Sequence, residues 1–486
     1  MEIPKEVKLV IKNLKKANFE AYIVGGCVRD VLRKAIPKDW DVATNANPKE
    51  IQKVFPDSFY KNKFGTVTVK IPTNKKDIFE VEITTYRNEE KYTDKRHPDK
   101  VNWAKTIEED LARRDFTVNA IALKLTDGKK KEITITDPFL GRKDLKNKII
   151  KAVGEPKKRF SEDALRLLRA VRFATTLGVD WKIEQKTLSA IKKNAPWLQA
   201  ISKERIKEEF EKIIMSEYAY DGLMLLHKTN LLKYIIPELE KGFGVSQNRH
   251  HIYTIFQHAL LSLKYAVKYN YNLNVRLAAL FHDIAKPQTK SGEGPDATFY
   301  NHDIVGAKIA MGILERLRFP KKTVEKVGTL IRNHMFFYDP EVVTESSVRR
   351  LLKKVGKENM EELVQLRITD RKGSGVPKAR PYRLRHFEYM VSKVSRDPIS
   401  VQMLKINGNE IMKILKTKSG PRVGLVLNAL LSEVLDDPKK NKKEFLKKRT
   451  KELAKLNEKE LKAKEKRVKE KKIEVDQEDK NKFWIK

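Results

Sequence analysis

One stretch, residues 21–43 with the sequence AYIVGGCVRDVLRKAIPKDWDVA, constrains the fold of this chain more than any other. Residues 22–24 are typical of the end of a buried strand, and Gly25 and Gly26 permit a tight turn with close backbone approach. Residues 28–34 are predicted to form a helix. A strand, a glycine turn and a helix N-terminus together make a cradle for phosphate groups. The stretch therefore predicts a phosphate-binding turn.

Two aspartates follow this turn. If residues 39–41 form a strand, the i, i+2 spacing places the carboxylates of Asp39 and Asp41 on the same face. Two neighbouring carboxylates are costly unless a cation lies between them. The combination predicts a bound nucleoside triphosphate, with its phosphates on the turn and magnesium ions held by Asp39 and Asp41.

The length of the chain, 486 residues, predicts about two to four domains. No apolar run approaches the roughly 20 residues that a membrane span requires. The N-terminal residues have the pattern of an amphipathic helix and not of a signal peptide. A single cysteine, Cys27, fits a reducing compartment and is expected to be a small packed side chain. We therefore expect a cytoplasmic protein with no membrane partner.

The net charge indicates a polyanionic partner. The chain carries 102 Lys and Arg against 65 Asp and Glu, a formal charge of +37. A field of this sign attracts nucleic acid and makes binding sensitive to salt. Residues 439–472 contribute 17 Lys or Arg and 6 Glu, a net charge of +11, which leaves +26 for the rest of the chain. A lysine-rich genomic composition is the alternative explanation.

A third carboxylate is expected on one of two predicted strands, FGTVTVKIP (64–72) and DIFEVEITTYR (77–87). Glu80 and Glu82 share one face of the second strand. Polymerase-type sites usually carry a further carboxylate beside the aspartate pair, to hold a metal or to take a proton from the primer hydroxyl. An ordinary exposed strand glutamate is the alternative.

The motif VGGCVRDVL followed by KDWDVAT resembles the signature of class II tRNA nucleotidyltransferases, which comprise CCA-adding enzymes and bacterial poly(A) polymerases of the DNA polymerase beta-like superfamily. The resemblance extends over most of residues 20–435. It implies an α+β multidomain fold: a nucleotidyltransferase head with a mixed sheet and helices, followed by an all-α neck, body and HD domain. It also implies that catalysis depends on Asp39, Asp41 and Glu82, and that the triphosphate lies against Gly25, Gly26 and Arg29.

Two segments after the second strand also resemble this family. Residues 86–106 are charged and are predicted to form a long mobile loop, which is similar to the family's flexible loop needed for the final A. Adjacent guanidiniums at Arg113 and Arg114 suit bidentate phosphate contacts. By resemblance, Arg114 contacts the nucleotide and Asp115 orients the two arginines.

The segment SEDALRLLRAVRFATTLG (161–178) is predicted to be a helix with Ser161 as its N-cap. Spacing alone indicates an ordinary salt-bridged helix. Glu162, Asp163 and Arg166, however, resemble the family's EDxxR motif, in which an Asp/Arg pair imitates the Watson-Crick edge that selects C or A. The resemblance adds Arg169 and Arg172 as further nucleotide contacts.

A second cluster of chemically active residues lies between positions 257 and 370, among helical patterns. Imidazoles and carboxylates grouped in this way are ligands for a divalent transition metal such as Mn, Ni, Co or Fe. The order H…HD…D resembles the HD phosphohydrolase superfamily and implies metal-activated water attacking a phosphoester, plausibly a 2′,3′-cyclic phosphate, a 2′-phosphate or a small phosphomonoester. A purely structural HD fold is the alternative. The predicted ligands are His258, His282, Asp283, His302, His334 and Asp370.

The last fifty residues are predicted to be a basic helix with a narrow apolar seam at Leu446, Leu453, Leu461 and Val468. Three roles stay open for this seam: packing back on the body, pairing as a coiled coil, or lying along tRNA phosphates. A solvated charge run is a fourth possibility.

The predicted division of the chain has five parts: a catalytic head (1–150), a neck with the template helix (151–245), an HD domain (246–375), an RNA-binding body (376–436) and a lysine-rich tail (437–486). The best interpretation is a CCA-adding enzyme that extends the tRNA 3′ end, at the acceptor stem, from CTP and ATP. A poly(A) polymerase, a CC-only or A-only enzyme, and an HD phosphohydrolase with an RNA-binding head are the alternatives. The sequence predicts no oligomeric state.

Overall fold

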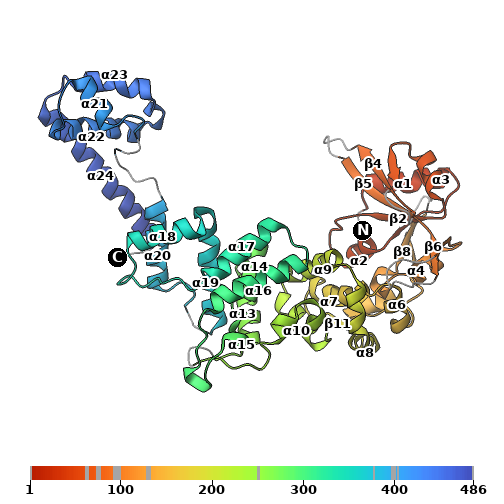
Figure 1. Cartoon of the computed structure of the whole chain (residues 1–486). Coiled ribbons are helices and arrows are strands. Elements are labelled where there is room, and N and C mark those ends of the chain that lie inside the picture. Colours follow the sequence, from red (N-terminus) through yellow and green to blue (C-terminus); the bar gives the residue numbers. More distant parts are fainter. Residues whose placement is uncertain are drawn as a thin grey trace. The chain divides into compact units, whose positions relative to one another are not determined.

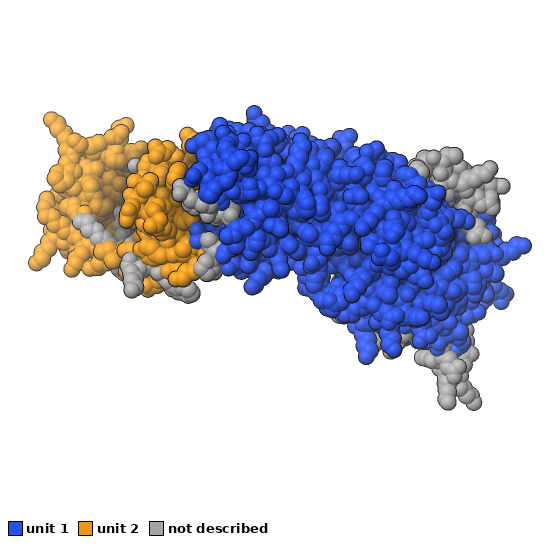
Figure 2. All heavy atoms as spheres, turned by 90° about the horizontal axis from the view of Figure 1, so that it is seen from below, with its two compact units in different colours: residues 1–332, 369–375 blue, residues 333–368, 376–486 orange. Residues whose placement is uncertain are grey.

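The computed structural model describes residues 3–60, 65–72, 78–90, 100–126, 133–248, 252–375, 378–395, 401 and 404–483. The chain forms two compact units, Met1–Arg332 with Thr369–Gly375 and Asn333–Ile368 with Val376–Lys486 (Figure 2). The predicted α+β class is confirmed, because a mixed sheet at the N-terminus precedes a long series of helices (Figure 1). The five predicted domain limits stay a prediction.

The head is built on a mixed sheet of seven strands in the described part of the chain, in the order β3-β4-β5-β2-β1-β8-β9. Strands β2 and β5 run parallel, and their register places Asp41 opposite Glu82. The other neighbouring pairs are antiparallel. The strands are β1 (Tyr22–Val24), β2 (Asp41–Thr44), β3 (Ser58–Tyr60), β4 (Thr66–Pro72), β5 (Ile78–Thr85), β8 (Ala122–Leu125) and β9 (Ile133–Thr136).

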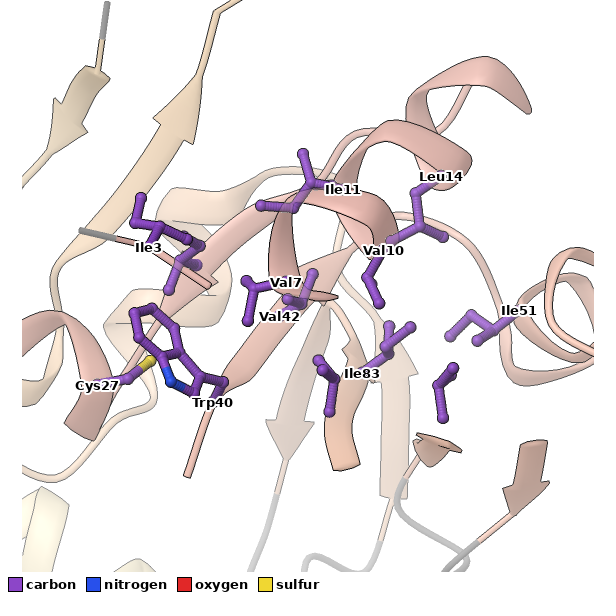
Figure 3. Packing of buried hydrophobic residues seen from close by; sticks show 14 of the residues in the cluster. Ile3, Val7, Val10, Ile11, Leu14, Cys27, Trp40, Val42, Ile51 and Ile83 are labelled. Atoms are coloured by element: carbon purple, nitrogen blue, oxygen red, sulfur yellow. The ribbon is translucent and has the colours of Figure 1, made fainter. Parts of the chain in front are cut away.

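Both faces of the sheet are buried, because alternate residues of one strand enter different hydrophobic clusters. On β1, Ile23 belongs to one cluster, and Tyr22 and Val24 belong to another. Helix α1 (Lys5–Lys16) adds its apolar residues to the cluster of Ile23, as Figure 3 shows. Helix α4 (Ile107–Ala112) adds apolar residues to the other cluster.

Helix α1 is amphipathic, as the N-terminal pattern predicts. Cys27 belongs to the same cluster as α1 and lies near Trp40 in Figure 3. Burial raises the pKa of the Cys27 thiol to about 12, so the thiol stays protonated and inert at neutral pH. The prediction of a packed cysteine is confirmed.

The prediction of one long loop at residues 86–106 is wrong at the two ends of this segment, which form strands. Strands β6 (Arg87–Glu90) and β7 (Lys100–Trp103) pair antiparallel as a separate ribbon. Cross-strand backbone hydrogen bonds compensate there for the shortage of apolar residues that led to the loop prediction. Residues 91–99, the middle of the predicted loop, lie outside the described residues.

The predicted continuous helix at residues 161–178 is also wrong. Helix α6 (Pro156–Glu162) ends at Glu162, Asp163 is extended (φ −141°, ψ 106°), and α7 (Leu165–Thr176) follows. The Asp163 carboxylate accepts a hydrogen bond from the Leu165 N–H at 3.0 Å. The aspartate side chain therefore competes with the helix for backbone partners and breaks it, while Ser161 lies inside α6 and caps nothing.

The remaining elements of the first unit connect the head to a series of helices. Short elements close the head: α2 (Gly26–Leu32), α3 (Pro48–Val54), η1 (Thr117–Asn119), α5 (Gly141–Lys146) and the two-stranded pair β10 (Ile149–Ile150) and β11 (Lys182–Ile183). The helical part then comprises α8 (Gln185–Asn194), η2 (Ala195–Ala200), α9 (Lys203–Met215), α10 (Ala219–Lys228), α11 (Leu232–Ile235), α12 (Pro237–Glu240), α13 (Ile255–Lys268), α14 (Leu273–Phe281), α15 (Lys286–Thr289), η3 (Gly294–Asp296), α16 (His302–Arg316) and α17 (Lys321–Arg332).

The second unit is helical in its described residues and contains a hydrophobic cluster that includes the apolar seam of the tail. Leu446, Leu453 and Leu461 are fully buried, and Val468 is nearly so. The tail therefore packs back on the helices of its own unit, which leaves its seam unavailable for a coiled coil. The elements are α18 (Glu345–Val355), η4 (Lys357–Asn359), α19 (Met360–Gly373, which runs into the first unit), α20 (Tyr382–Ser395), α21 (Gly408–Leu415), α22 (Pro421–Asp436), η6 (Pro438–Lys440), α23 (Lys443–Leu453) and α24 (Glu458–Phe483).

Among the described helices, none combines the length and the apolar character needed to cross a membrane.

Two substitutions in α24 test the packing of the tail. Leu461→Ala removes a fully buried side chain and should lower the free energy of unfolding of the second unit by about 2–5 kcal/mol. Ile473→Ala in the same helix, where the side chain is 68% exposed, should change it by less than about 0.5 kcal/mol. Hydrogen exchange of the α22 amides measures both, and equal protection in the two variants would contradict the packing.

Candidate active site

The glycine turn lies between β1 and α2 and needs glycine at its first position. Gly25 has φ +79°, a conformation that other residues rarely adopt. A Cβ at Gly25 would lie 3.0 Å from Arg114 Nη1 and 3.2 Å from Asp41 Oδ2. The turn therefore brings free backbone against both a carboxylate and a guanidinium, as a close approach to phosphate requires.

Asp41 and Glu82 face each other across the parallel pair β2 and β5. Both side chains are half-buried, while Asp39 is exposed and precedes the first residue of β2. The strand assumed at residues 39–41 is therefore not present, because strand pairing begins only at Asp41, although Asp39 and Asp41 both line one cavity. Trp40 is buried between them, and its carbonyl accepts the Glu82 N–H at 3.1 Å.

Two cavities of the first unit share the Asp41 side chain as a lining residue. The smaller has a volume of about 340 Å³ and the larger about 930 Å³. Asp41, Gly26 and Arg29 line both cavities, whereas Asp39 lines only the larger. The other residues of the smaller cavity are Gly25, Arg113, Arg114, Asp115, Asn119, Asp163, Arg166, Arg169, Phe173 and Arg205.

Asp110 orients the adjacent Arg113 and Arg114 and was not among the residues predicted from sequence. It is fully buried and accepts from Arg113 Nη2 at 2.7 Å and from Arg114 Nη2 at 3.1 Å. Burial alone raises the pKa of Asp110, but the two guanidiniums outweigh burial and hold this pKa below its ordinary value. The resemblance-based assignment of this orienting role to Asp115 is therefore wrong.

Asp115 instead binds Arg169 of α7. Arg169 donates to Asp115 Oδ2 from Nε at 2.8 Å and from Nη2 at 2.6 Å. Burial raises the pKa of Asp115, but Arg169 and Asn119 outweigh burial and hold it well below its ordinary range. Asn119 also accepts from Arg29 Nη1 at 2.9 Å, so one chain of hydrogen bonds joins the predicted phosphate contact to α7.

Arg172 differs from the other predicted nucleotide contacts because it lines only the larger cavity. It donates to the buried Glu209 of α9 at 2.7 Å. Its guanidinium lies 3.5 Å from the ring centroid of Phe173, and those of Arg29 and Arg169 each lie 5.2 Å from it. Phe173 thus contacts three guanidiniums through its ring. These arginines were predicted from the sequence, whereas Phe173 was not.

The predicted base-reading residues, Asp163 and Arg166, both line the smaller cavity. Each of them has hydrogen-bond partners other than the side chain of the other. Arg166 donates to Glu162 at 2.7 Å and to the carbonyls of Arg159 and Arg113. Asp163 is bound by Arg205 of α9, with Nη2 to Oδ2 at 2.8 Å. Nothing in the pattern of SKERIKEEF distinguished Arg205 from a surface arginine of an amphipathic helix.

A second group of ligating side chains lies among the helices that follow. His258 (α13), His282 and Asp283 (after α14) and Asp370 (α19) bring nitrogen and carboxylate atoms together. His258 Nε2 lies 3.0 Å from His282 Nε2 and 3.3 Å from both Asp283 Oδ2 and Asp370 Oδ1. His302 Nε2, from the start of α16, lies 3.5 Å from Asp283 Oδ1. His334 belongs to the second unit, and its role as a ligand stays a prediction.

The chemistry of this group fits a divalent cation. Nδ1 of His282 lies 2.9 Å from the Ala279 carbonyl, and Nδ1 of His302 lies 2.7 Å from that of Phe299, so Nδ1 is the donor in both rings and Nε2 is the atom that can bind a metal. Burial lowers the pKa of His282, but Asp283 and Asp370 outweigh burial and raise it to about 10. The carboxylates therefore favour a positive charge at this point, which a metal ion supplies.

The fold of the head and its cavity are those of a polymerase-type nucleotidyltransferase. The domain models and curated relatives of this chain match the family of class II tRNA nucleotidyltransferases and bacterial poly(A) polymerases that carry an HD domain. Three family models match the chain: the poly A polymerase head domain at residues 21–151, a probable RNA- and SrmB-binding site of polymerase A at residues 180–243, and the HD domain at residues 255–372.

Individual relatives agree with this assignment. The CCA-adding enzyme of Lactococcus lactis subsp. lactis is 43% identical over 237 residues, which cover 48% of this chain and 56% of the relative. That of Enterococcus faecalis is 42% identical over 242 residues, which cover 50% and 56%. The matches thus span about half the length of these curated relatives.

Solved structures extend the similarity over nearly the whole chain. The CCA-adding enzyme of Bacillus stearothermophilus in complex with CTP is 28% identical, with a TM-score of 0.57 and coverage of 93% of this chain and 98% of that one. The Thermotoga maritima enzyme complexed with tRNA is 19% identical, with a TM-score of 0.53 and coverage of 92% and 95%, and supports the fold alone.

Asp115→Asn should destabilise the protein by about 3 kcal/mol at pH 7, because it removes the negative charge whose Oδ2 accepts from both Nε and Nη2 of Arg169. The native pKa of Asp115 lies below that of the unfolded chain, about 3.9. The stabilisation by Asp115 is therefore complete above that pH and declines as the pH falls below it. Urea unfolding at pH 7 and pH 3 should show the variant and the wild type converging in acid.

Asp180→Asn is the matched control, because this side chain is 73% exposed and lies 3.9 Å from Lys148. It should unfold like the wild type at both pH values. A constant difference between Asp115→Asn and the wild type across this pH range would contradict the assigned direction of the Asp115 pKa.

Proposed function

We propose that this chain is a template-independent RNA nucleotidyltransferase that adds C, C and A to the 3′ end of tRNA, using CTP and ATP. One observation carries the proposal: a single cavity joins the glycine turn, the Asp41 carboxylate and the Asp163 and Arg166 side chains. Relatives named CCA-adding enzymes and a solved complex of such an enzyme with CTP support it. We place this activity in the cytoplasm and retain the five predicted segments as its domains.

The triphosphate would lie on the glycine turn. Gly25 and Gly26 present backbone there, and Arg29 and Arg114 supply positive charge to phosphate oxygens. Asp110 and Asn119 hold these two guanidiniums, so little side-chain entropy is lost when the nucleotide binds. The substrate's charge would thus meet a preorganised set of donors.

The carboxylates that fit magnesium are Asp39 and Asp41, with Glu82 opposite Asp41 across the sheet. Carboxylate oxygens are the ligands that Mg²⁺ prefers. Magnesium at these residues would supply activation of the terminal 3′-hydroxyl and neutralisation of the leaving pyrophosphate. Glu82 is placed to orient Asp41 or to accept a proton from the hydroxyl.

The larger cavity would take the 3′ end of the tRNA, because it reaches the same Asp41 from another side and is lined by Arg33, Lys38 and Lys212. The base of the incoming nucleotide would be read by Asp163 and Arg166. Asp163 can accept from the exocyclic amino group that C and A share, and Arg166 can donate to a ring acceptor. This pair would select the two bases without a nucleic-acid template.

A second activity is proposed for the HD group, because its buried imidazoles and carboxylates converge on one point. We propose that it holds Mn, Ni, Co or Fe and hydrolyses phosphomonoesters, 2′-phosphates or 2′,3′-cyclic phosphates by activating water. Lys286 lies 2.7 Å from Asp283 Oδ2 and holds this carboxylate in place. His302 would serve a second metal, and His334 is retained as a predicted ligand.

Purified protein incubated with tRNA lacking CCA, with magnesium and with CTP and ATP separately and together, tests the first activity. Sequencing should find CCA at the 3′ end only with both nucleotides, whereas long A tails from ATP alone would assign a poly(A) polymerase. Addition limited to CC or to A would assign a partial enzyme. Asp41→Asn should lower the rate at least about a thousandfold, because it removes a metal ligand. Asp57→Asn, at an exposed position, should leave the rate unchanged.

The two activities should separate by substitution. Asp283→Asn should abolish hydrolysis of a 2′,3′-cyclic nucleotide by protein loaded with Mn²⁺ or Ni²⁺ and should leave nucleotide addition intact. Asp41→Asn should do the reverse. Metal bound per chain, measured by mass spectrometry after dialysis, should fall in Asp283→Asn. Equal metal content and no hydrolysis in the wild type would leave a structural HD fold as the explanation.

A further inference from the structure

The strongest unassigned feature of the nucleotide cavity is the partner of Asp163. Arg205 reaches this aspartate from α9, forty-two positions further along the chain. Its two terminal nitrogens bind the two carboxylate oxygens in parallel, Nη2 to Oδ2 at 2.8 Å and Nη1 to Oδ1 at 3.3 Å. Both side chains line the cavity and are mostly buried, with 18% and 28% of their surface exposed. The pair is therefore a bidentate contact inside the site.

Asp163 has no regular secondary structure to hold it. It lies in the break between α6 and α7, where its backbone is extended. Within this break, its Oδ1 also accepts the Leu165 N–H at 3.0 Å. One backbone donor and one guanidinium thus determine the plane in which the carboxylate lies. The backbone contact alone leaves Oδ2 without a positioning partner.

Arg166 is held independently of Asp163. Its guanidinium donates to Glu162 and to the Arg159 and Arg113 carbonyls, which are fixed by the chain around the cavity. The two members of the proposed base-reading pair therefore have separate supports. Disturbing the support of Asp163 should leave Arg166 in place.

We propose that Arg205 is a positioning residue for base selection, which holds the Asp163 carboxylate so that it accepts from the exocyclic amino group of the incoming base. The inference rests on the proposed nucleotidyltransferase function and adds a residue that determines its specificity. Arg205 acts through Asp163 and needs no contact with the nucleotide.

The position of the Asp163 carboxylate would decide which of the four bases can bind. C and A present an amino group at the edge that Asp163 would face, whereas U and G present a carbonyl oxygen there. A carboxylate is an acceptor only, so a fixed one binds an amino group and repels a carbonyl. A carboxylate has room for about four hydrogen bonds, and three are occupied by Leu165 and Arg205, which leaves one on Oδ2 for the base.

Without Arg205, the carboxylate can rotate away from the base or accept water instead. The attraction for C and A and the repulsion of U and G should then weaken together. Binding of the triphosphate depends on other residues, so the main loss should be in discrimination between bases.

Arg205→Ala and Arg205→Lys test the proposal in single-nucleotide addition to tRNA lacking CCA. The measured quantities are the ratio of kcat/KM for CTP over UTP, and the same ratio for ATP over GTP on tRNA ending in CC. Arg205→Ala should lower these ratios about tenfold to a hundredfold, the size of one well-placed base contact. Arg205→Lys, which keeps a cation but not two parallel donors, should lower them less.

Glu204→Gln is the matched control. Glu204 precedes Arg205 in α9, is 61% exposed and lies 3.7 Å from the exposed Arg318. It should keep the wild-type ratios. Thermal unfolding of all variants shows which of them remain folded, and Arg205→Lys answers the question if Arg205→Ala does not fold.

The outcomes separate this inference from the function on which it rests. Wild-type protein that adds no nucleotide to tRNA rejects the proposed function and the role of Arg205 with it. Wild-type protein that adds C and A, beside folded Arg205 variants with unchanged ratios, rejects the role of Arg205 alone. Equal losses for matched and mismatched nucleotides would assign Arg205 to stability of the neck.

Discussion

The parallel pairing of β2 with β5 is the constraint on which the rest of the site depends. Its register brings Asp41 opposite Glu82, although forty positions separate them in the chain. The same first residue of β2 lies beside the Gly25 backbone, so any side chain at Gly25 would meet the carboxylate. The proposed site for phosphate and divalent metal thus depends on one strand register and one turn, and Asp41 lines both cavities there.

The second requirement is electrostatic. The smaller cavity gathers six arginines that would repel one another in a poorly solvated site if they had no partners. Buried carboxylates from separate segments compensate three of them: Asp110 binds Arg113 and Arg114, and Asp115 binds Arg169. Glu209 does the same for Arg172 of the larger cavity. Each carboxylate gains more from its guanidinium than burial costs it, as the lowered pKa values show. The positive field is therefore held in place before any nucleotide arrives.

Backbone carbonyls and a lysine hold side chains of the HD group in place. The predicted ligands within the first unit come from three helices and from the connection after α14. Carbonyls of Ala279 and Phe299 fix the ring orientation of His282 and His302, and Lys286 fixes Asp283. Rigid helices and local hydrogen bonds thus orient the ligands without a metal. This arrangement supports chemistry in the helical part of the first unit that is separate from the chemistry in the head.

The sequence by itself determined the α+β class and the strand, glycine turn and helix at residues 22–32, and it indicated the carboxylates and the predicted HD ligands as candidates, because residue chemistry and local spacing carry these features. It left open what the apolar seam of the tail packs against. It did not determine that α6 ends at Glu162 or that β2 begins at Asp41, since side-chain hydrogen bonding and strand pairing override local periodicity there. Only the tertiary structure decided the partners, Asp110 for Arg114 and Arg205 for Asp163 among them. Charged side chains on a helix look alike in a sequence, and burial against another element alone selects which of them meet.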